Sequence, residues 1–285
     1  MHINWFPGHM AKAHRMIREH VGLVDVVVEL LDARIPVSSA NPVIDQVVGN
    51  KPRIIAFNKA DLADQEETQK WAAHFRRLGM TVVMIEAVSG KGTKVLVNQI
   101  EAAASTKLKA WEAKGIRGRA IRVMILGIPN VGKSSLINRL CGEAAVRTSD
   151  KPGVTRGKQW IKIGKNLELL DTPGVLWPKL EDQEAAFRLA VTGAIADDTY
   201  DMEDVVIRLL GLLKNQYNNR LLERYNLESP LPETVEELVE LIGARRGCLR
   251  SGGVVDVDKA RRIILKEFRS GTLGSFTLDQ LEAEI

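Results

Sequence analysis

Short apolar runs separated by polar turns recur through the first part of the chain. Four of them read PRIIAF (52–57), TVVMI (81–85), AIRVMILG (120–127) and NLELL (166–170), and their lengths are typical of buried strands. The third run leads into SSLINRLCG (134–142), where apolar residues recur at helical spacing and a glycine follows. Strands that alternate with helices predict an α/β fold with a mostly parallel sheet and helices on both faces.

The pattern changes from about residue 184, because apolar residues then recur at three- and four-residue spacing without strand-like alternation. One segment begins at Asp256, where a helix N-cap belongs, and SPLPE (229–233) indicates a turn between helices. We therefore predict a sheet domain over residues 1–180 and a small all-helical, basic domain over residues 181–285. The expected helical segments are AAFRLAVTGAIA, MEDVVIRLLGLLKNQYNNRLLERY, ETVEELVELIG and DVDKARRIILKEF.

The stretch GIPNVGKS (127–134) lies between the third run and the helix that follows it, and it fits the phosphate-loop pattern G-x-x-x-x-G-K-[ST]. In such a loop, backbone N–H groups close around phosphate oxygens and the lysine, here Lys133, reaches the outer phosphates. The Ser134 hydroxyl is a candidate Mg²⁺ ligand. The alternative is a chance match in a glycine-rich turn. The other expected nucleotide contacts in this loop are Asn130, Val131, Gly132 and Ser135.

The stretch NKAD, Asn58 to Asp61, follows the first apolar run and is a candidate guanine-reading motif. The Asp61 carboxylate can accept both the N1–H and the exocyclic amine of guanine, a donor pair that adenine lacks. Asn58 can bond the base edge, the Lys59 stem can pack on its face, and Ala60 completes the motif. The alternative is an ordinary polar turn followed by an N-cap aspartate.

Two further loops supply candidates for the γ-phosphate and its metal ion. DTPG offers Asp171 to hold an Mg²⁺ water and the Gly174 N–H to meet the γ-phosphate. KPGVTRG offers Thr155 as a second Mg²⁺ ligand on a loop that the γ-phosphate orders.

A second base loop is expected at EAVSGKG (86–92), by its position after the run TVVMI. It corresponds to the usual S-A-K loop, with the Ala87 N–H facing the guanine oxygen. Glu86 and Val88 replace the usual serine and lysine, so this assignment depends more on position than on residue identity.

These motifs are those of a GTPase, but they run in a rotated order, with both base loops before the phosphate loop. Ligands of open α/β sheets bind outside the carboxyl ends of the strands, so joining the old termini and cutting elsewhere preserves the site. We therefore expect a circularly permuted P-loop GTPase domain whose join lies in LKAWEAKGIRGRA (108–120).

The permuted order, together with WFPGHM (5–10), DARIP (32–36) and RRGCLRSGG (245–253), closely resembles the YlqF/RbgA family of ribosome biogenesis GTPases. The likeness spans nearly the whole chain. It implies GTP hydrolysis at a late step of large (50S) ribosomal subunit assembly, with the large subunit and its rRNA as partners and hydrolysis stimulated by that subunit. GTP or GDP and Mg²⁺ are the implied cofactors.

The catalytic water needs a guide, because many GTPases place a glutamine after the switch II glycine and this chain has Val175 there. His9 is the leading candidate, since imidazole can hold a water or accept its proton. The alternative for His9 is a surface or RNA-contacting residue. With Lys133 and Thr155, His9 makes up the predicted catalytic set.

Asn130 resembles the asparagine of potassium-activated GTPases, so K⁺ is a further expected cofactor that would neutralise developing charge. The alternative is a turn residue that tolerates left-handed geometry.

Composition is that of a globular protein: 285 residues, 45% hydrophobic and 27% charged. The most apolar region is interrupted by Asp25 and Glu29, no secretory signal is evident, and Cys141 and Cys248 have no partners at metal-ligand spacing. We expect a cytoplasmic monomer without a zinc site, stable membrane association or DNA partner.

The formal net charge of +4 permits a polyanionic partner, and basic residues concentrate between positions 245 and 269. A basic run alone is more often a solvated helix face. The ribosomal resemblance favours RNA phosphates instead. The cluster comprises Arg245, Arg246, Arg250, Lys259, Arg261, Arg262, Lys266 and Arg269.

Two other functions stay open at this point. One is a GTP-dependent RNA-binding scaffold with little catalysis, suggested by the missing glutamine. The other is a signalling switch, which would favour a lipidation motif, and neither CaaX nor an N-terminal glycine is present.

Overall fold

The computed structural model describes residues 15, 17–116, 118–142, 160–170 and 182–281. These residues form two compact units. The sheet unit contains residues 15–170 and 277–281, and the helical unit contains residues 182–276. The expected division kept residues 181–285 together. The structure instead adds 277–281 to the sheet unit, because Asp279 bonds to the loop after the first strand.

Within the described residues the sheet has six strands in the order β3-β2-β1-β4-β6-β5. All neighbouring pairs are parallel except β5 with β6. The predicted fold class, a mostly parallel α/β sheet followed by helices, is confirmed. The strands are β1 (Val26–Asp32), β2 (Arg53–Asn58), β3 (Thr81–Met84), β4 (Ile121–Gly127), β5 (Trp160–Ile163) and β6 (Leu167–Leu170).

β1 lies between β2 and β4, and all seven of its residues are buried. Glu29, which interrupts the apolar run in the sequence, forms an ion pair with Arg53 of β2. Asp25, just before the strand, pairs with Lys107 and accepts a hydrogen bond of 3.0 Å from the N–H of Arg122. Because both carboxylates have partners, burying them does not prevent the strand from forming.

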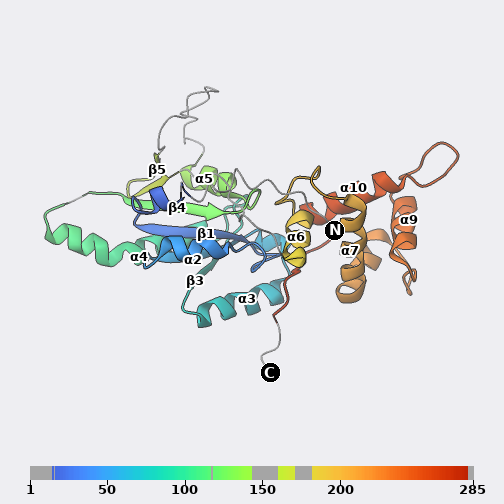
Figure 1. Cartoon of the computed structure of the whole chain (residues 1–285), viewed down its shortest axis with the longest axis horizontal. Helices are drawn as coiled ribbons and strands as arrows, with labels where there is room; N and C mark the ends of the chain where they lie inside the picture. The colour runs from blue at the N-terminus through green and yellow to red at the C-terminus, as the bar shows by residue number, and fades with distance from the viewer. Residues whose placement is uncertain (1–14, 16, 117, 143–159, 171–181, 282–285) are drawn as a thin grey trace. The chain divides into compact units, whose positions relative to one another are not determined.

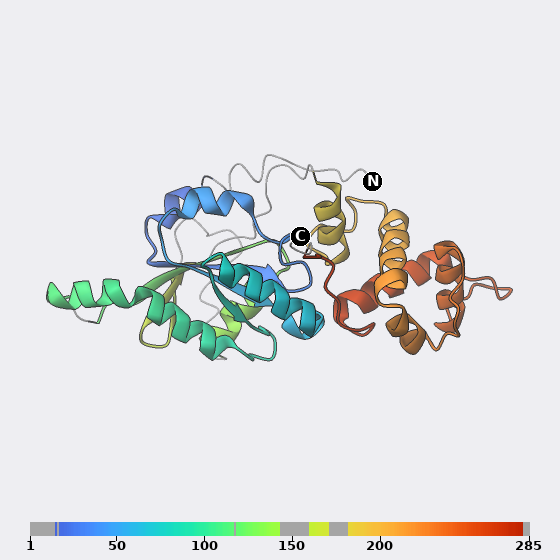
Figure 2. The ribbon, with the colours of Figure 1, turned by 90° about the horizontal axis from the view of Figure 1, so that it is seen from below.

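Helices cover both faces of the sheet, as Figure 2 shows with α2 on one side and α3 and α4 on the other. α2 (Pro42–Val48) packs in a cluster with Met124 and Leu126 of β4. On the opposite face, α3 (Gln65–Arg77) places Trp71 in a cluster with Phe57 of β2.

The connection between β3 and β4 is largely helical (Figure 1). α4 (Thr93–Ala113) runs into the predicted join at 108–120, and α5 (Lys133–Cys141) follows β4. Alanine, leucine, lysine and glutamate dominate residues 104–113, and their helix propensity extends α4 beyond the sheet.

Four of the five described helices of the helical unit, all except α8, begin with a side-chain cap. Asp201 and Asp256 cap α7 and α10 through bonds to backbone N–H groups, and Thr234 and Glu237 form a capping box at α9. The predicted cap at Asp256 is thus confirmed. No helix among the described residues has the length and apolar character to cross a membrane. The helices are α6 (Gln183–Val191), α7 (Met202–Gln216), α8 (Asn218–Tyr225), α9 (Val235–Arg245) and α10 (Val257–Ser270).

Candidate nucleotide site

The phosphate loop connects the carboxyl end of β4 to the start of α5, as predicted. Asn130 and Gly132 have left-handed φ angles of 56° and 104°. A Cβ on Gly132 would lie 2.3 Å from Asn58 Nδ2, and one on Gly127 would lie 2.7 Å from the Leu30 carbonyl oxygen. Only glycine fits these two positions, so the loop keeps the tight curvature that turns backbone N–H groups toward a bound anion.

Lys133 and Ser134 begin α5 at the end of this loop. The Lys133 ammonium donates to the carbonyl oxygens of Gly127 at 3.1 Å and Ile128 at 3.2 Å. The lysine therefore already points back over the loop that would hold phosphate. Ser134 is exposed in the first turn of α5, and Ser135 is half-buried beside it.

Asn58 connects the guanine-reading motif to both neighbouring loops. It ends β2 and is 2% exposed. Its Nδ2 donates to the Val131 carbonyl of the phosphate loop at 2.7 Å, and its Oδ1 accepts from the Ala87 N–H at 2.9 Å. Three motifs separated in sequence thus meet at one buried amide, at the carboxyl edge of the sheet where ligands of such folds bind.

The rest of NKAD forms a tight turn with its last carboxylate exposed. Lys59 has a left-handed φ of 59°, and its ammonium donates to Asp32 Oδ2 at 3.0 Å. Ala60 donates to the Ile85 carbonyl at 3.3 Å. Asp61 is exposed, and it is among the charges that raise the pKa of Lys91. Its carboxylate is therefore accessible to a base.

Glu86 has a structural role in the base loop that the sequence comparison with S-A-K did not suggest. Its carboxylate accepts from the Lys91 ammonium and from Ser89 Oγ, both at 2.8 Å. Both bonds lower the pKa of Glu86, and the bond from Lys91 has the larger effect. The loop is further closed by a 2.7 Å bond from the Gly90 N–H to the Glu86 carbonyl. Glu86, which stands in place of the usual serine, therefore stabilises the loop through an ion pair with Lys91 of the same loop.

The Ala87 N–H is already engaged by Asn58, so in this structure it holds the asparagine side chain in place. Its expected contact with the guanine oxygen stays a prediction. Arg139 of α5 adds a second constraint, because its guanidinium donates to the Val88 carbonyl. Gly90 packs against the same side chain.

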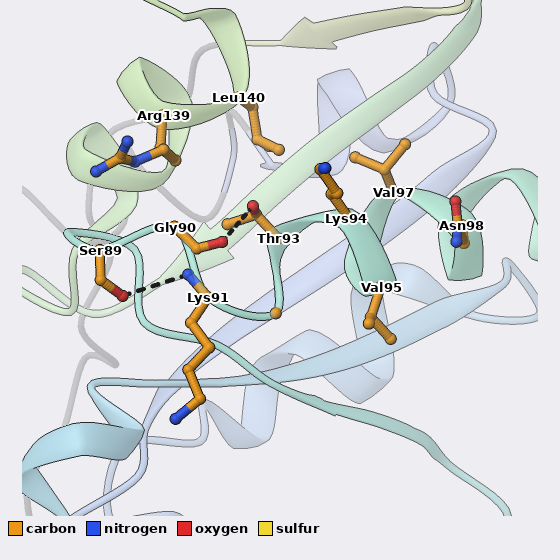
Figure 3. Close-up of a pocket in the computed structure, with 11 residues that line it drawn as sticks. Ser89, Gly90, Lys91, Thr93, Lys94, Val95, Val97, Asn98, Arg139 and Leu140 are labelled. Carbon is orange, nitrogen blue, oxygen red and sulfur yellow. Dashed lines mark hydrogen bonds between the residues drawn. The ribbon is translucent and has the colours of Figure 1, made fainter.

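An open cavity of about 770 Å³ lies on the outer side of the base loop (Figure 3). Residues 89–95, Val97 and Asn98 line it together with Arg139 and Leu140 of α5. Its lining includes neither NKAD nor the phosphate loop. The cavity is therefore separate from the predicted nucleotide contacts.

Several predicted site residues lie outside the described part of the chain. These are His9, the predicted catalytic base or water guide, and Thr155, Asp171 and Gly174, the predicted Mg²⁺ and γ-phosphate contacts. Their assigned roles stay predictions.

The basic cluster of the helical unit divides into structural and exposed residues. Arg246 pairs with the buried Glu267 at 2.6 Å, and Arg261 pairs with Glu203 at 2.5 Å. Arg269 donates to the carbonyls of Val191 and Ala190 and pairs with Asp197. These three arginines stabilise the unit itself. Arg250 pairs with Asp256 near the surface, whereas Arg245, Lys259, Arg262 and Lys266 are exposed.

Comparison with known proteins gives a consistent set of relatives. A family model described as 50S ribosome-binding GTPase matches residues 122–231. Ribosome biogenesis GTPase A of Bacillus cereus is 49% identical over 99% of this chain and 95% of its own length. The protein of the same name from Priestia megaterium is 50% identical over 98% of this chain and 97% of its own length.

Solved structures agree with the sequence relatives. A GDP-bound structure of YlqF is 28% identical, with a TM-score of 0.69 over 94% of this chain and all of that one. GNP-bound YlqF from T. maritima gives a TM-score of 0.65 over 95% of this chain, also at 28% identity.

Proposed function

From its membership of the ribosome biogenesis GTPase A family and its GTPase activity, we propose that the chain acts at a late step of large ribosomal subunit assembly. We place this step in the cytoplasm. In this proposal GTP is hydrolysed to GDP and phosphate on the assembling subunit, which stimulates the reaction.

The observation that carries the proposal is the position of Asn58 between the phosphate loop and the base loop. A phosphate loop alone serves any nucleotide. Its connection through one buried amide to NKAD and to residues 86–92 supports a guanine-specific site, in which Asp61 would match the donor pair of that base.

The described residues fit the cofactors of this reaction. Gly127 and Gly132 let the phosphate loop pack closely on Leu30 and Asn58, a tight turn that suits backbone N–H donation to phosphate oxygens, and the exposed Ser134 can supply a hydroxyl to Mg²⁺. When bound, Mg²⁺ neutralises phosphate charge. Thr155 and Asp171 are the further proposed ligands of this ion. Asn130, whose left-handed geometry suits either a turn residue or a ligand, is the proposed K⁺ ligand.

The proposed rRNA contact uses the exposed part of the basic cluster. Lys259, Arg262 and Lys266 are exposed at spacings of three and four residues, so they share one face of α10. With the exposed Arg245 they give four cations for phosphate oxygens. The paired Arg246, Arg261 and Arg269 are less suited to this role because binding RNA would break bonds inside the unit.

Co-sedimentation with purified large subunits in GTP and GDP tests the assignment. We expect nucleotide-dependent binding that falls when Lys259, Arg262 and Lys266 are replaced by glutamine. Lys70 and Arg77 on α3 with Lys109 on α4, replaced in the same way, remove the same three charges from the sheet unit and provide the control. Absence of binding in both nucleotide states would contradict the role in assembly and leave the GTPase chemistry intact.

His9→Ala tests the proposed water guide. GTP affinity should stay nearly unchanged, because the imidazole would contact the water and not the nucleotide. Turnover stimulated by the large subunit should fall by about 10²- to 10⁴-fold, as for the loss of a positioned proton-transfer group. Single-turnover hydrolysis with and without subunits measures both, and an unchanged stimulated rate would return His9 to a surface or RNA-contacting role.

A further inference from the structure

The loop that follows β1 is closed by residues 277–281, which we call the clamp segment. The Asp279 carboxylate accepts hydrogen bonds from the N–H groups of Val37 at 2.7 Å and Ser38 at 2.9 Å. It also accepts from Ser38 Oγ at 2.6 Å. Asp279 is 3% exposed. A buried carboxylate with three donors on one loop holds that loop in a single conformation.

The clamp segment is also bonded through its backbone. The Leu278 N–H donates to the Arg34 carbonyl at 2.8 Å, and Trp71 Nε1 of α3 donates to the Asp279 carbonyl at 3.1 Å. Leu281 packs against the cluster that contains Trp71 and Phe57. The segment is therefore a fixed part of the sheet unit, although the helical unit precedes it in sequence.

The clamped loop carries a buried ion pair. Arg34 donates from Nε to Asp32 Oδ1 at 2.9 Å and from its terminal nitrogen to Oδ2 at 2.8 Å. Both residues are 1% exposed. Burial raises the pKa of Asp32, but the charges of Arg34 and Lys59 outweigh it and hold that pKa well below its usual range. Asp32 is therefore an ionised carboxylate.

The same carboxylate reaches the guanine-reading motif, because Asp32 Oδ2 accepts from the Lys59 ammonium at 3.0 Å. Lys59 has a left-handed φ of 59°, which a side chain with a Cβ adopts only when its surroundings impose it. The Ala33 N–H also donates to the Asn58 carbonyl at 2.9 Å. The clamped loop thus contacts the side chain of Lys59 and the backbone just before it.

We propose that Asp32 is a positioning residue for guanine-nucleotide binding and that the clamp segment supports it through the loop. Asp32 fixes the Lys59 ammonium so that its stem lies ready to pack on the base. The clamp holds Arg34 and the loop on which Asp32 depends. This inference rests on the proposed guanine site, and it makes base affinity depend on residues that follow the helical unit.

A double-mutant cycle tests the connection with the full chain. The variants are Asp279→Asn, Lys59→Met and their combination, and the measurement is the Kd of GDP and of GTP by fluorescence titration. Lys59→Met should weaken both about tenfold, the effect of losing one charged contact. Asp279→Asn should raise the Kd of GDP and the Kd of GTP by the same factor of a few fold. The factor is shared because the change does not alter the contacts to the phosphates, where the two nucleotides differ. The double variant should bind no more weakly than Lys59→Met.

Asp64→Ala is the control. Asp64 caps α3 in the same unit, where its Oδ1 accepts from the N–H groups of Glu66 and Glu67, so alanine removes a charge and both of these bonds. It should lower Tm without changing the Kd of GDP. A purely structural role for Asp279 would make the two variants behave alike.

The inference is overturned if Asp279→Asn weakens GDP binding equally in the wild-type and the Lys59→Met backgrounds, or leaves the Kd of the folded protein unchanged. If Asp279→Asn does not fold, Ser38→Ala, which removes one of the three clamp bonds, takes its place in the same cycle. Wild-type protein that binds no GDP would instead refute the proposed function.

Discussion

Replacing Asn58 by alanine tests the connection at the centre of the nucleotide site. The side chain is 2% exposed and bonds to the Val131 carbonyl at 2.7 Å and the Ala87 N–H at 2.9 Å. Alanine would leave both backbone groups buried without this partner. Each orphaned group costs about 1–3 kcal/mol, so the free energy of unfolding of the sheet unit should fall by about 2–6 kcal/mol.

Tryptophan fluorescence during urea unfolding measures this change. Among the described residues the tryptophans are Trp71, Trp111 and Trp160, and all three belong to the sheet unit. Their fluorescence therefore reports on the unfolding of that unit. The measurement must be made without nucleotide, because a bound ligand adds its own stabilisation.

Asn98→Ala on the exposed side of α4 is the control for loss of an asparagine side chain. It should change the free energy of unfolding by no more than about 0.5 kcal/mol. If Asn58→Ala matches this control, the buried amide does not hold the two loops together, and the argument for a guanine site built around it fails.

Three further predictions concern the base, the cation and acid stability. Asp61→Asn should shift preference from guanine toward xanthine nucleotides, because a donor replaces the acceptor at the purine 2-position; competition binding with GDP and XDP measures it. Hydrolysis should be faster in potassium than in sodium at equal ionic strength, and Asn130→Ala should erase the difference; equal wild-type rates would refute the K⁺ role. Bonds from Arg250 and the Lys259 N–H lower the pKa of Asp256 from 3.8 to about 2, so their stabilisation is present above pH 3.8 and is lost as the pH falls toward 2. Circular dichroism of wild type and Asp256→Asn through that window should show a smaller pH dependence in the variant.

The periodicity of the sequence predicted most strands but not all of them. The runs TVVMI, AIRVMILG and NLELL contain β3, β4 and β6, and PRIIAF covers β2 except its last residue, Asn58. β5 has only four residues, and its first three are not fully buried, so alternation cannot identify it. β1 carries Glu29 at its centre, and its burial depends on Arg53 of the neighbouring strand, a partner that only the folded sheet supplies.

The proximity of the predicted site loops follows from short motifs. NKAD and GIPNVGKS predict Asn58, Lys59 and Lys133 as site residues, and the structure brings the two motifs together through the bond from Asn58 to Val131. The contacts of Asp32 with Lys59 and of Arg139 with Val88 join residues 27 and 51 positions apart. Such pairings depend on how strands and helices align in space, and no local pattern encodes them.

The position of the clamp segment also determines when the sheet unit can be completed during synthesis. The bond between Val37 and Asp279 joins residues 242 positions apart, with the entire helical unit translated between them. Contacts between residues so far apart in sequence form late in folding, because forming them costs the conformational entropy of the long intervening chain. A nascent or truncated chain that stops before residue 277 therefore carries both base loops and the phosphate loop but cannot close the loop behind Lys59. During translation the helices that carry the basic cluster are therefore synthesised before the sheet unit receives its last segment.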